Sequence, residues 1–347
     1  MLKSLQKFLS ILFYIRILKL GENTMNRKKV FVTREILPER LEILRKNFDV
    51  DVWKEYAPPS KETIIEHIKD ADAILTMLSD KIDAEVINAA PKLKVIAQLA
   101  VGYDNIDLKA AKERGIYVTN TPDALTDASA DFSFALMMAI ARRVVEADKY
   151  VRAGNWKVAW HPTMMLGAPM RGKTLGIIGA GRIGQAMAKR GRGFDMNILY
   201  FNRSKKPEFE KECGAKKVEL DELLKESDFV SIHVPLNDQT RGLINAEKLA
   251  LMKKTAYLIS NARGPVIEEK ALYEALKNHS IAGAALDVFC KEPTPADNPL
   301  LELDNIVVAP HISSANTSTR TEMSVMNAND ITAVLTGKEP KNIVVKP

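Results

Sequence analysis

Cysteine is nearly absent from this chain, which has only Cys213 and Cys290 among its 347 residues. The two form no CxxC pair, and the five histidines do not cluster at metal-ligand spacing. A disulfide framework and a zinc site are therefore not indicated. Two isolated thiols fit a reducing, cytoplasmic setting, which we expect for this protein.

A surplus of charge of one sign is also missing from most of the chain. The net charge is +6, from 50 basic and 44 acidic side chains, and residues 1–29 account for this surplus. The remainder is close to neutral and lacks the basic patch that is the electrostatic footprint of a nucleic-acid binder. We therefore expect no nucleic-acid partner.

A hydrophobic run long enough to cross a bilayer is likewise missing from the opening stretch, MLKSLQKFLSILFYIRILKLGENT. Lys3 and Lys7 precede an apolar run there, but Arg16 interrupts it and no small-residue cleavage site follows. We expect no membrane span, and we expect residues 1–24 to be a dispensable extension. The alternative for this stretch is an amphipathic helix at a membrane surface.

The chain contains enough apolar sequence for two cores, since 46% of its residues are hydrophobic and 27% are charged. From residue 28, short apolar runs such as KVFVT, DVDVW and DAILTML alternate with helical stretches. Strands that recur between amphipathic helices imply parallel βαβ units. A long helical segment follows at residues 125–154, which either bridges two lobes or forms a buried core helix.

A second alternating series begins at KTLGIIGAGRIG and continues through NILYFN, DFVSIHVPL, TAYLISNARG, IAGAALDVF and NIVVAPHI. Six strand candidates in this order are typical of a doubly wound sheet. A last helical segment, roughly residues 317–335, precedes the apolar NIVV of the tail, which we assign to the first lobe. We therefore predict one domain from residues 25–124 and 315–347 and a second from residues 125–314.

A glycine-rich turn, GAGRIG, stands between an apolar strand and a helix in this second series. Gly179 permits the tight turn, Gly181 lets the backbone approach a pyrophosphate, and Gly184 allows close packing of helix on strand. The free N–H groups at the helix N-terminus then face the phosphates. A lone GxGxxG can be a packing turn, but strand, turn and helix agree here, which indicates a dinucleotide site.

The stretch LYFNRSKK, residues 199–206, indicates which dinucleotide is preferred. Asn202 follows Gly184 by 18 residues, near the position where an Asp or Glu holds the ribose 2′-hydroxyl of NAD. Asn202 has no charge to repel a phosphate, Arg203 offers a planar fork for a 2′-phosphate, and Ser204 adds a donor. We predict that NADP(H) is preferred and that NAD(H) is the second option. The alternative is that RSKK is a solvated surface turn.

Three polar residues follow successive predicted strands: Arg263 in SNARGPV, Glu292 in LDVFCKEP and His311 in VVAPHISS. The carboxyl ends of parallel strands border the ligand crevice, so these side chains should converge on the cofactor. Histidine has a pKa near neutrality, so His311 can protonate a nascent alkoxide, and Glu292 can orient the protonated ring. Arg263 can bind a carboxylate and polarise a carbonyl. Singly, such residues are commonly ion-pair, turn or core residues, but their shared placement favours catalysis.

The motifs LAVGYDNID, GAGRIG, HVPLNDQTRGLIN, NARG, LDVFCKEP and PHI together resemble the D-isomer-specific 2-hydroxyacid dehydrogenase family, and within it the glyoxylate/hydroxypyruvate reductases. The similarity covers essentially residues 28–347. It implies an α/β fold of two Rossmann-like, doubly wound parallel-sheet domains, a flavodoxin-like substrate domain and an NAD(P)-binding Rossmann domain. It also implies that Arg263 binds the substrate, that Glu292 supports His311, and that His311 exchanges the proton.

The resemblance implies further contacts with substrate and cofactor. Backbone amides near Val101 and Gly102 would help to hold the substrate carboxylate, and Asp287 would contact the nicotinamide amide. The other implied cofactor contacts are Gly179, Ala180, Gly181, Arg182, Ile183, Gly184, Asn202, Arg203, Ser204, Asn261, Ala262, Arg263, His311 and Ser313.

The segment NWKVAWHPTMMLG is similar to a loop that, in glyoxylate/hydroxypyruvate reductases, passes into the active site of the partner subunit. Trp160 would then face the substrate, and its alternative role is that of a tryptophan in the dimer core. The family implies a homodimer built by the nucleotide-binding domains.

The sequence therefore predicts an enzyme that uses NADPH to reduce glyoxylate or hydroxypyruvate to glycolate or D-glycerate. A phosphoglycerate dehydrogenase or another D-2-hydroxyacid dehydrogenase is the alternative within the family. A formate dehydrogenase is disfavoured, because that branch lacks a glutamate paired with the catalytic histidine. The alternative of another class is a corepressor-like binding protein, which keeps this fold and uses the nucleotide as a switch.

Overall fold

The computed structural model describes residues 27–347, so the expectations for residues 1–24 lie outside the described part. The chain forms two compact units. Of the described residues, unit 1 contains those from residue 27 up to Pro122 and the returning segment Arg320–Pro347, and unit 2 contains Asp123–Thr319. Among the described residues, no helix is both long and apolar enough to cross a membrane.

Unit 1 is built around a six-stranded sheet in the order β13-β5-β4-β3-β1-β2. Strands β1 to β5 are parallel, and their order 2-1-3-4-5 is that of flavodoxin-like folds. The tail of the chain returns as β13, which pairs antiparallel with β5. The strand bounds are β1 (Lys29–Val32), β2 (Asp49–Val52), β3 (Ala73–Thr76), β4 (Val95–Gln98), β5 (Tyr117–Thr119) and β13 (Ile343–Val345).

Short polar side chains begin three helices of unit 1. Ser60, Asp83 and Asp107 each accept a hydrogen bond from the backbone N–H three residues later, which satisfies a donor that the first helical turn leaves unpaired. The helices of this unit are α2 (Pro38–Arg45), α3 (Lys61–Ile68), α4 (Ala84–Asn88), α5 (Leu108–Glu113) and most of α13 (Thr317–Leu335).

Unit 2 is built around a seven-stranded parallel sheet in the order β12-β11-β10-β9-β6-β7-β8. This is the 3-2-1-4-5-6 order of dinucleotide-binding folds with one further strand at the end. The sequence predicted six of these strands and missed β8, which has only two residues. The bounds are β6 (Thr174–Ile178), β7 (Asn197–Phe201), β8 (Lys216–Lys217), β9 (Phe229–Ile232), β10 (Tyr257–Ser260), β11 (Gly283–Leu286) and β12 (Ile306–Val308).

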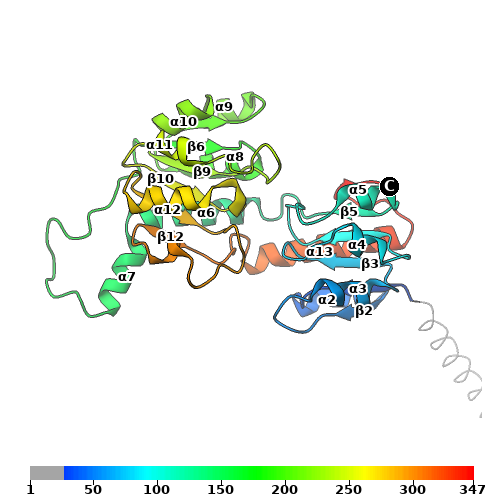
Figure 1. Cartoon of the computed structure of the whole chain (residues 1–347). Helices are drawn as coiled ribbons and strands as arrows, with labels where there is room; N and C mark the ends of the chain where they lie inside the picture. Colours follow the sequence, from blue (N-terminus) through cyan, green and yellow to red (C-terminus); the bar gives the residue numbers. More distant parts are fainter. Residues whose placement is uncertain (1–26) are drawn as a thin grey trace, which may run out of the picture. The chain divides into compact units, whose positions relative to one another are not determined.

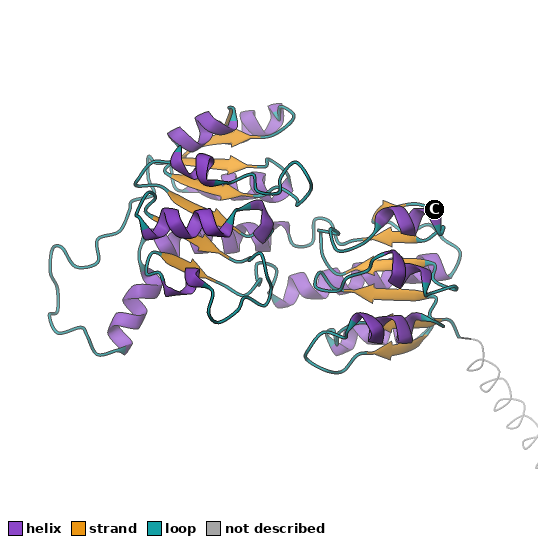
Figure 2. Ribbon diagram, viewed as in Figure 1, coloured by secondary structure: helices purple, strands orange, loops and turns teal. Residues whose placement is uncertain are grey.

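Helices lie on both sides of each sheet (Figure 2), so the predicted α/β class with two doubly wound sheets is confirmed. The helices of unit 2 are α6 (Thr126–Ala141), α7 (Val144–Arg152), α8 (Arg182–Gly193), α9 (Pro207–Cys213), α10 (Leu220–Glu226), α11 (Ala246–Ala250) and α12 (Glu269–Lys277), with short 3-10 turns at Gly264–Val266 and Pro299–Glu302.

The prediction of one long helix at residues 125–154 is wrong, because two helices occupy this segment. The chain returns across the end of α6, where the Ala168 N–H donates to the Ala141 carbonyl at 2.8 Å. The Ala141 carbonyl thus accepts this N–H and not one from a further turn of the helix, and Arg143 adopts a left-handed φ of 55°. Of the two alternatives for this segment, α6 is a buried core helix, whereas α7 has no buried residue.

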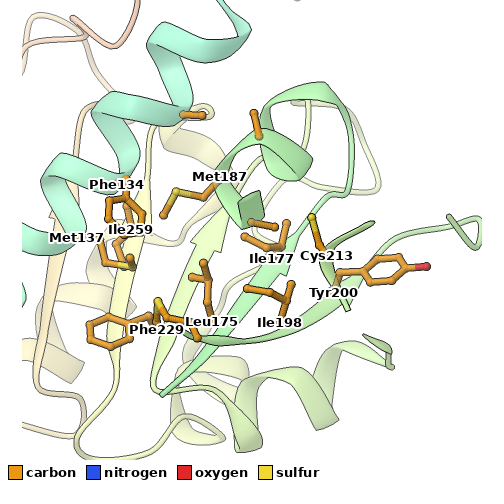
Figure 3. Packing of buried hydrophobic residues seen from close by; sticks show 14 of the residues in the cluster. Phe134, Met137, Leu175, Ile177, Met187, Ile198, Tyr200, Cys213, Phe229 and Ile259 are labelled. Carbon is orange, nitrogen blue, oxygen red and sulfur yellow. The ribbon is translucent and has the colours of Figure 1, made fainter. Parts of the chain in front are cut away.

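The core of unit 2 fixes the turn between β6 and α8. Phe134 from α6, Ile177 from β6 and Met187 from α8 belong to one buried cluster, shown in Figure 3. Tyr200 enters the same cluster from β7, but its hydroxyl points away from the other labelled side chains. Strand, helix and turn are therefore held as one rigid element.

Candidate active site and cofactor site

The turn between β6 and α8 contains three glycines, each in a different environment. Gly179 has a φ of 97°, and a Cβ there would lie 2.7 Å from the His233 carbonyl oxygen. A Cβ on Gly184 would lie 2.1 Å from the Gly179 carbonyl oxygen, so α8 approaches the turn this closely only with glycine. A Cβ on Gly181 would meet nothing within 4 Å. The space over Gly181 is open to a ligand.

The N-terminus of α8 fits a pyrophosphate. Gly181 is the N-cap, and no side chain caps the first N–H groups of the helix. These N–H groups and the positive end of the helix dipole attract an anion. Arg182, the first helical residue, is largely exposed and pairs with Asp123, with 2.5 Å between Nε and Oδ1. The donor set therefore suits the phosphates of a dinucleotide.

The turn after β7 carries the residues that the sequence associates with cofactor choice. The side-chain amide of Asn202 donates to the Ser204 carbonyl at 2.9 Å and lies 3.3 Å from the Ser204 hydroxyl, which closes the turn on itself. Arg203 is exposed, and within residues 27–347 its side chain has no hydrogen bond or ion pair. The guanidinium is therefore available to a ligand.

His233, for which the sequence predicts no role, lies beside the glycine turn. It follows β9, the neighbour of β6 on the side where the strand order reverses, which is where ligands bind in such sheets. Its ring lies 2.8 Å from the Ser231 hydroxyl, and burial lowers the pKa of His233 to about 3. The ring is therefore neutral at physiological pH. The position of HVPLN directly after a predicted strand was the signal that could have found it.

Arg263 follows β10 by three residues, and its Nη1 donates to the Ala262 carbonyl at 2.9 Å. The next residue, Gly264, is buried against the loop after β11, because a Cβ there would lie 1.9 Å from the carbonyl carbon of Phe289. This contact holds the loop of Arg263 directly on the loop of Glu292. The positive charge of Arg263 is one of the causes that lower the pKa of Glu292.

The structure brings His311 and Glu292 together, with 2.7 Å between Nδ1 and Oε2. The other oxygen, Oε1, accepts the Phe289 N–H at 2.9 Å. Burial opposes the charged form of Glu292, but the hydrogen bond and charge of His311 outweigh it, so the pKa of Glu292 lies below its ordinary range. The carboxylate therefore stays ionised at neutral pH and fixes the imidazole, which leaves Nε2 for another partner.

Asp287 holds the backbone that carries His311. Its two carboxylate oxygens accept the N–H groups of Ile312 at 2.8 Å and Ser313 at 2.9 Å, and its carbonyl accepts the His311 N–H at 2.8 Å. These bonds support a left-handed φ of 57° at His311. Burial raises the pKa of Asp287 despite the two N–H donors. Its implied contact with the nicotinamide amide stays a prediction.

Ala180 lies in the turn between β6 and α8, and Ile183 lies in the first turn of α8. The other predicted residues lie in three places. The Asn261 amide donates to the Ser129 carbonyl of α6 at 3.0 Å, which ties the end of β10 to that helix. Val101 and Gly102 lie in the loop after β4 in unit 1 and are partly exposed. Trp160 lies in the loop after α7, and 76% of its surface is exposed.

This arrangement can bind an anion at a helix N-terminus, hold a histidine on a carboxylate, and present a guanidinium beside that carboxylate. These are the parts that proton exchange at a carbonyl requires next to a dinucleotide site. Within the part of the chain that the structure describes, no group of three His, Cys, Asp or Glu side chains is placed to hold a metal ion.

A family model described as "D-isomer specific 2-hydroxyacid dehydrogenase, NAD binding domain" matches residues 134–313. The matched span contains the glycine turn, Arg263 and the His311–Glu292 pair. The chain belongs to the D-isomer-specific 2-hydroxyacid dehydrogenase family. This dehydrogenase therefore binds a nicotinamide dinucleotide, and the match places that function in unit 2.

Similarity to known members extends over most of the dehydrogenase. This chain is 57% identical to the glyoxylate reductase of Korarchaeum cryptofilum over 318 residues, which are 92% of this chain and 96% of that relative. The crystal structure of the TT0316 protein from Thermus thermophilus has a TM-score of 0.87 at 45% identity and covers 91% of this chain and 100% of its own. The NADPH-dependent glyoxylate/hydroxypyruvate reductase of Sinorhizobium meliloti, solved with NADP and malonate, has a TM-score of 0.82 at 31% identity, covering 92% and 97%.

Proposed function

We propose that this dehydrogenase reduces a small 2-oxo acid to the D-2-hydroxy acid, with glyoxylate and hydroxypyruvate as the leading substrates. The observation that carries the proposal is the His311–Glu292 pair, with 2.7 Å between Nδ1 and Oε2, on a loop packed against that of Arg263. The names of two relatives support it, since one is a glyoxylate reductase and the other a glyoxylate/hydroxypyruvate reductase.

Each side chain has a defined task in this proposal. His311 donates the proton on Nε2 to the oxygen of the 2-oxo group as that group is reduced, and Glu292 stabilises the imidazolium before the transfer. Arg263 binds the substrate carboxylate and polarises the carbonyl, and the amides near Val101 and Gly102 bind the same carboxylate. When bound, the reduced nicotinamide supplies the hydride. Unit 1 is then the substrate domain.

The test follows NADPH absorbance with glyoxylate, hydroxypyruvate, pyruvate and phosphohydroxypyruvate. We expect oxidation of NADPH by the wild-type enzyme and a loss of kcat of about a hundredfold or more in His311→Gln, as for the removal of a general acid. His279→Gln, which changes an exposed histidine that precedes β11, is the matched control. Turnover of none of these acids, with nucleotide binding retained, would favour a corepressor-like protein, and preference for phosphohydroxypyruvate would favour a phosphoglycerate dehydrogenase.

We propose further that NADPH is preferred over NADH. The support is the turn after β7, which offers the unengaged side chain of Arg203 and no acid to repel a 2′-phosphate. Fluorescence titration of both nucleotides tests this without turnover. Arg203→Ala should weaken NADPH about ten- to a hundredfold, as for the loss of charge-assisted hydrogen bonds, and leave NADH nearly unchanged. Arg171→Ala removes an exposed arginine elsewhere and is the control. Equal losses for both nucleotides would refute the preference.

Finally, we propose a homodimer built through unit 2. The support is the arm, which we define as residues 144–166 and which extends away from the sheet of unit 2 in Figure 1. Seven exposed apolar side chains lie in the arm, and such a concentration marks an interaction surface. They are Val144, Val145, Val151, Trp156, Val158, Trp160 and Leu166. A cytoplasmic location stays a prediction from the cysteine content.

A further inference from the structure

Hydrogen bonds hold three consecutive carbonyls in the loop after β4. The Ala100 carbonyl accepts the Thr121 N–H at 3.0 Å. The Val101 carbonyl accepts the side-chain amide of Asn120 at 2.8 Å, and the Gly102 carbonyl accepts that of Gln98 at 3.2 Å. The loop thus takes its shape from donors outside itself.

The geometry of the peptide unit links each of these three hydrogen bonds to the direction of an N–H group. A trans peptide is planar, and its N–H points opposite to its C=O. Pinning the carbonyls of residues 100, 101 and 102 therefore sets the directions of the N–H groups of Val101, Gly102 and Tyr103. Within residues 27–347 none of these three N–H groups has an acceptor, and none of the three residues is buried. They are donors available to an anion.

The two side-chain clamps are themselves firmly held. Gln98, the last residue of β4, is fully buried, and its amide also donates to the Asn105 side chain at 2.8 Å. Asn105 in turn donates to the carbonyls of Met77 at 3.0 Å and Asp80 at 2.7 Å. Asn120, just after β5, is 9% exposed. Both clamps therefore start from the ends of neighbouring strands and not from the middle of a loop.

We propose that Gln98 and Asn120 are positioning residues that aim the amides of Val101 and Gly102, together with that of Tyr103, at the carboxylate of the 2-oxo acid. The inference rests on the proposed function, because it takes the loop to be a carboxylate site. The clamps touch no reacting atom, so they act on carboxylate binding and not on proton exchange. Their loss should appear in KM for the acid.

The experiment compares Asn120→Ala and Asn120→Asp with the wild-type enzyme. Alanine deletes the donor, and aspartate keeps the shape but turns an acceptor toward the Val101 carbonyl. We expect KM for glyoxylate to rise about tenfold with alanine, the factor that about 1.4 kcal/mol gives, and further with aspartate. The inhibition constant of malonate should rise in parallel, whereas kcat and the dissociation constant of NADPH should stay within about twofold of wild type.

Asn305→Ala is the matched control, because its amide also clamps two carbonyls, those of Leu276 at 3.1 Å and Ala282 at 3.4 Å, in unit 2. An unchanged KM and malonate constant in Asn120→Ala, or a loss shared equally by kcat, NADPH binding and melting temperature, overturns the positioning role. Malonate binding weakened by Asn120→Ala in an enzyme that reduces no 2-oxo acid would support the role and sink the proposed function. A wild-type protein that neither turns over glyoxylate nor binds malonate would sink both.

Discussion

Glu292 uses both of its carboxylate oxygens, one on His311 and one on the backbone N–H of Phe289. These contacts hold the pKa of Glu292 below its ordinary range, so at pH values between the lowered and the ordinary pKa the folded protein binds fewer protons at this side chain than the unfolded protein. The stabilisation of the folded state by these contacts is therefore complete at neutral pH and is lost only as the pH falls through the lowered pKa. The protonation of Glu292 therefore does not change near neutral pH.

Glu292→Gln should move the alkaline limb of the reduction profile. Glutamine keeps the shape but removes the negative charge that stabilises the imidazolium. We expect the pH at which kcat/KM falls to drop by about one unit, which corresponds to about 1.4 kcal/mol of lost interaction. The measurement is the pH dependence of kcat/KM for wild type and variant, with the exposed Glu302→Gln as control. Superimposable alkaline limbs would show that Glu292 does not act through the charge of His311.

Tyr200→Phe should loosen the turn that carries Arg203. The Tyr200 hydroxyl, which points away from the core in Figure 3, accepts the Lys206 N–H at 2.9 Å and donates to Glu210 at 2.7 Å. Removing it leaves the Lys206 N–H unpaired, which costs about 1–3 kcal/mol of unfolding free energy. Urea denaturation measures that loss, and nucleotide titration should show a larger loss for NADPH than for NADH. Tyr257→Phe, which removes a hydroxyl from β10, is the control. A Tyr200→Phe variant as stable as this control would refute the role of the Tyr200 hydroxyl.

At the scale of elements, one glycine is required by backbone packing and another leaves space for a ligand. Gly264→Ala would drive a Cβ to 1.9 Å from the carbonyl carbon of Phe289, where backbone meets backbone. We expect a loss of several kcal/mol of stability and of nearly all activity, because the loops of Arg263 and Glu292 are forced apart. Gly181→Ala meets nothing within 4 Å, so it should fold normally and raise the dissociation constant of NADPH. Thermal unfolding and nucleotide titration distinguish the two, and an unstable Gly181→Ala would contradict the argument.

The elements that the sequence predicts correctly are those that repeat a local pattern. The strands of unit 2 are apolar runs between helices, and GAGRIG joins a strand to a helix as expected. The sequence misses β8, whose two lysines make no run, and the break at Arg143, which depends on Ala168 reaching the end of α6. Contacts between distant segments decide both features.

The residues of the candidate site differ in the same way: some follow from local sequence pattern, and others depend on contacts between distant segments. Arg263, Glu292 and His311 could be predicted as candidates because each follows a predicted strand of one parallel sheet. Local pattern contains no trace of the Gln98 and Asn120 clamps, since each bonds a carbonyl whose position depends on tertiary structure. Residues that are proposed to act directly can therefore be predicted from the sequence, whereas those that are proposed to hold the backbone in place require coordinates.

At the scale of the whole molecule, the arm is the feature that one chain does not account for. None of the nine residues of α7 is buried, although three of them are valines. Trp156 is 55% exposed and Val158 is 56% exposed in the loop that follows. A second copy of the chain would remove this apolar surface from water, which is favourable by about 25 cal/mol per Å².

Trp156→Glu combined with Val158→Glu should therefore convert a dimer into a monomer. Sedimentation equilibrium of the wild type should give twice the mass of one chain, and the double variant should give the mass of one. Tyr56→Glu is the control, because Tyr56 of unit 1 is fully exposed but lies outside the arm. A monomeric wild type would remove the basis for the proposed dimer.

Trp160→Ala then distinguishes between the two roles predicted for that tryptophan in the proposed dimer. A substrate-facing ring in the partner's site should, when removed, raise KM for hydroxypyruvate while the sedimenting mass stays that of two chains. A ring in the dimer core should instead lower the mass toward one chain, because truncating a buried interface tryptophan commonly costs more than about 2 kcal/mol of association. Measuring KM at a protein concentration where the wild type is fully dimeric keeps the two effects apart. An unchanged KM and an unchanged mass would exclude both roles and leave Trp160 as an exposed side chain of the arm.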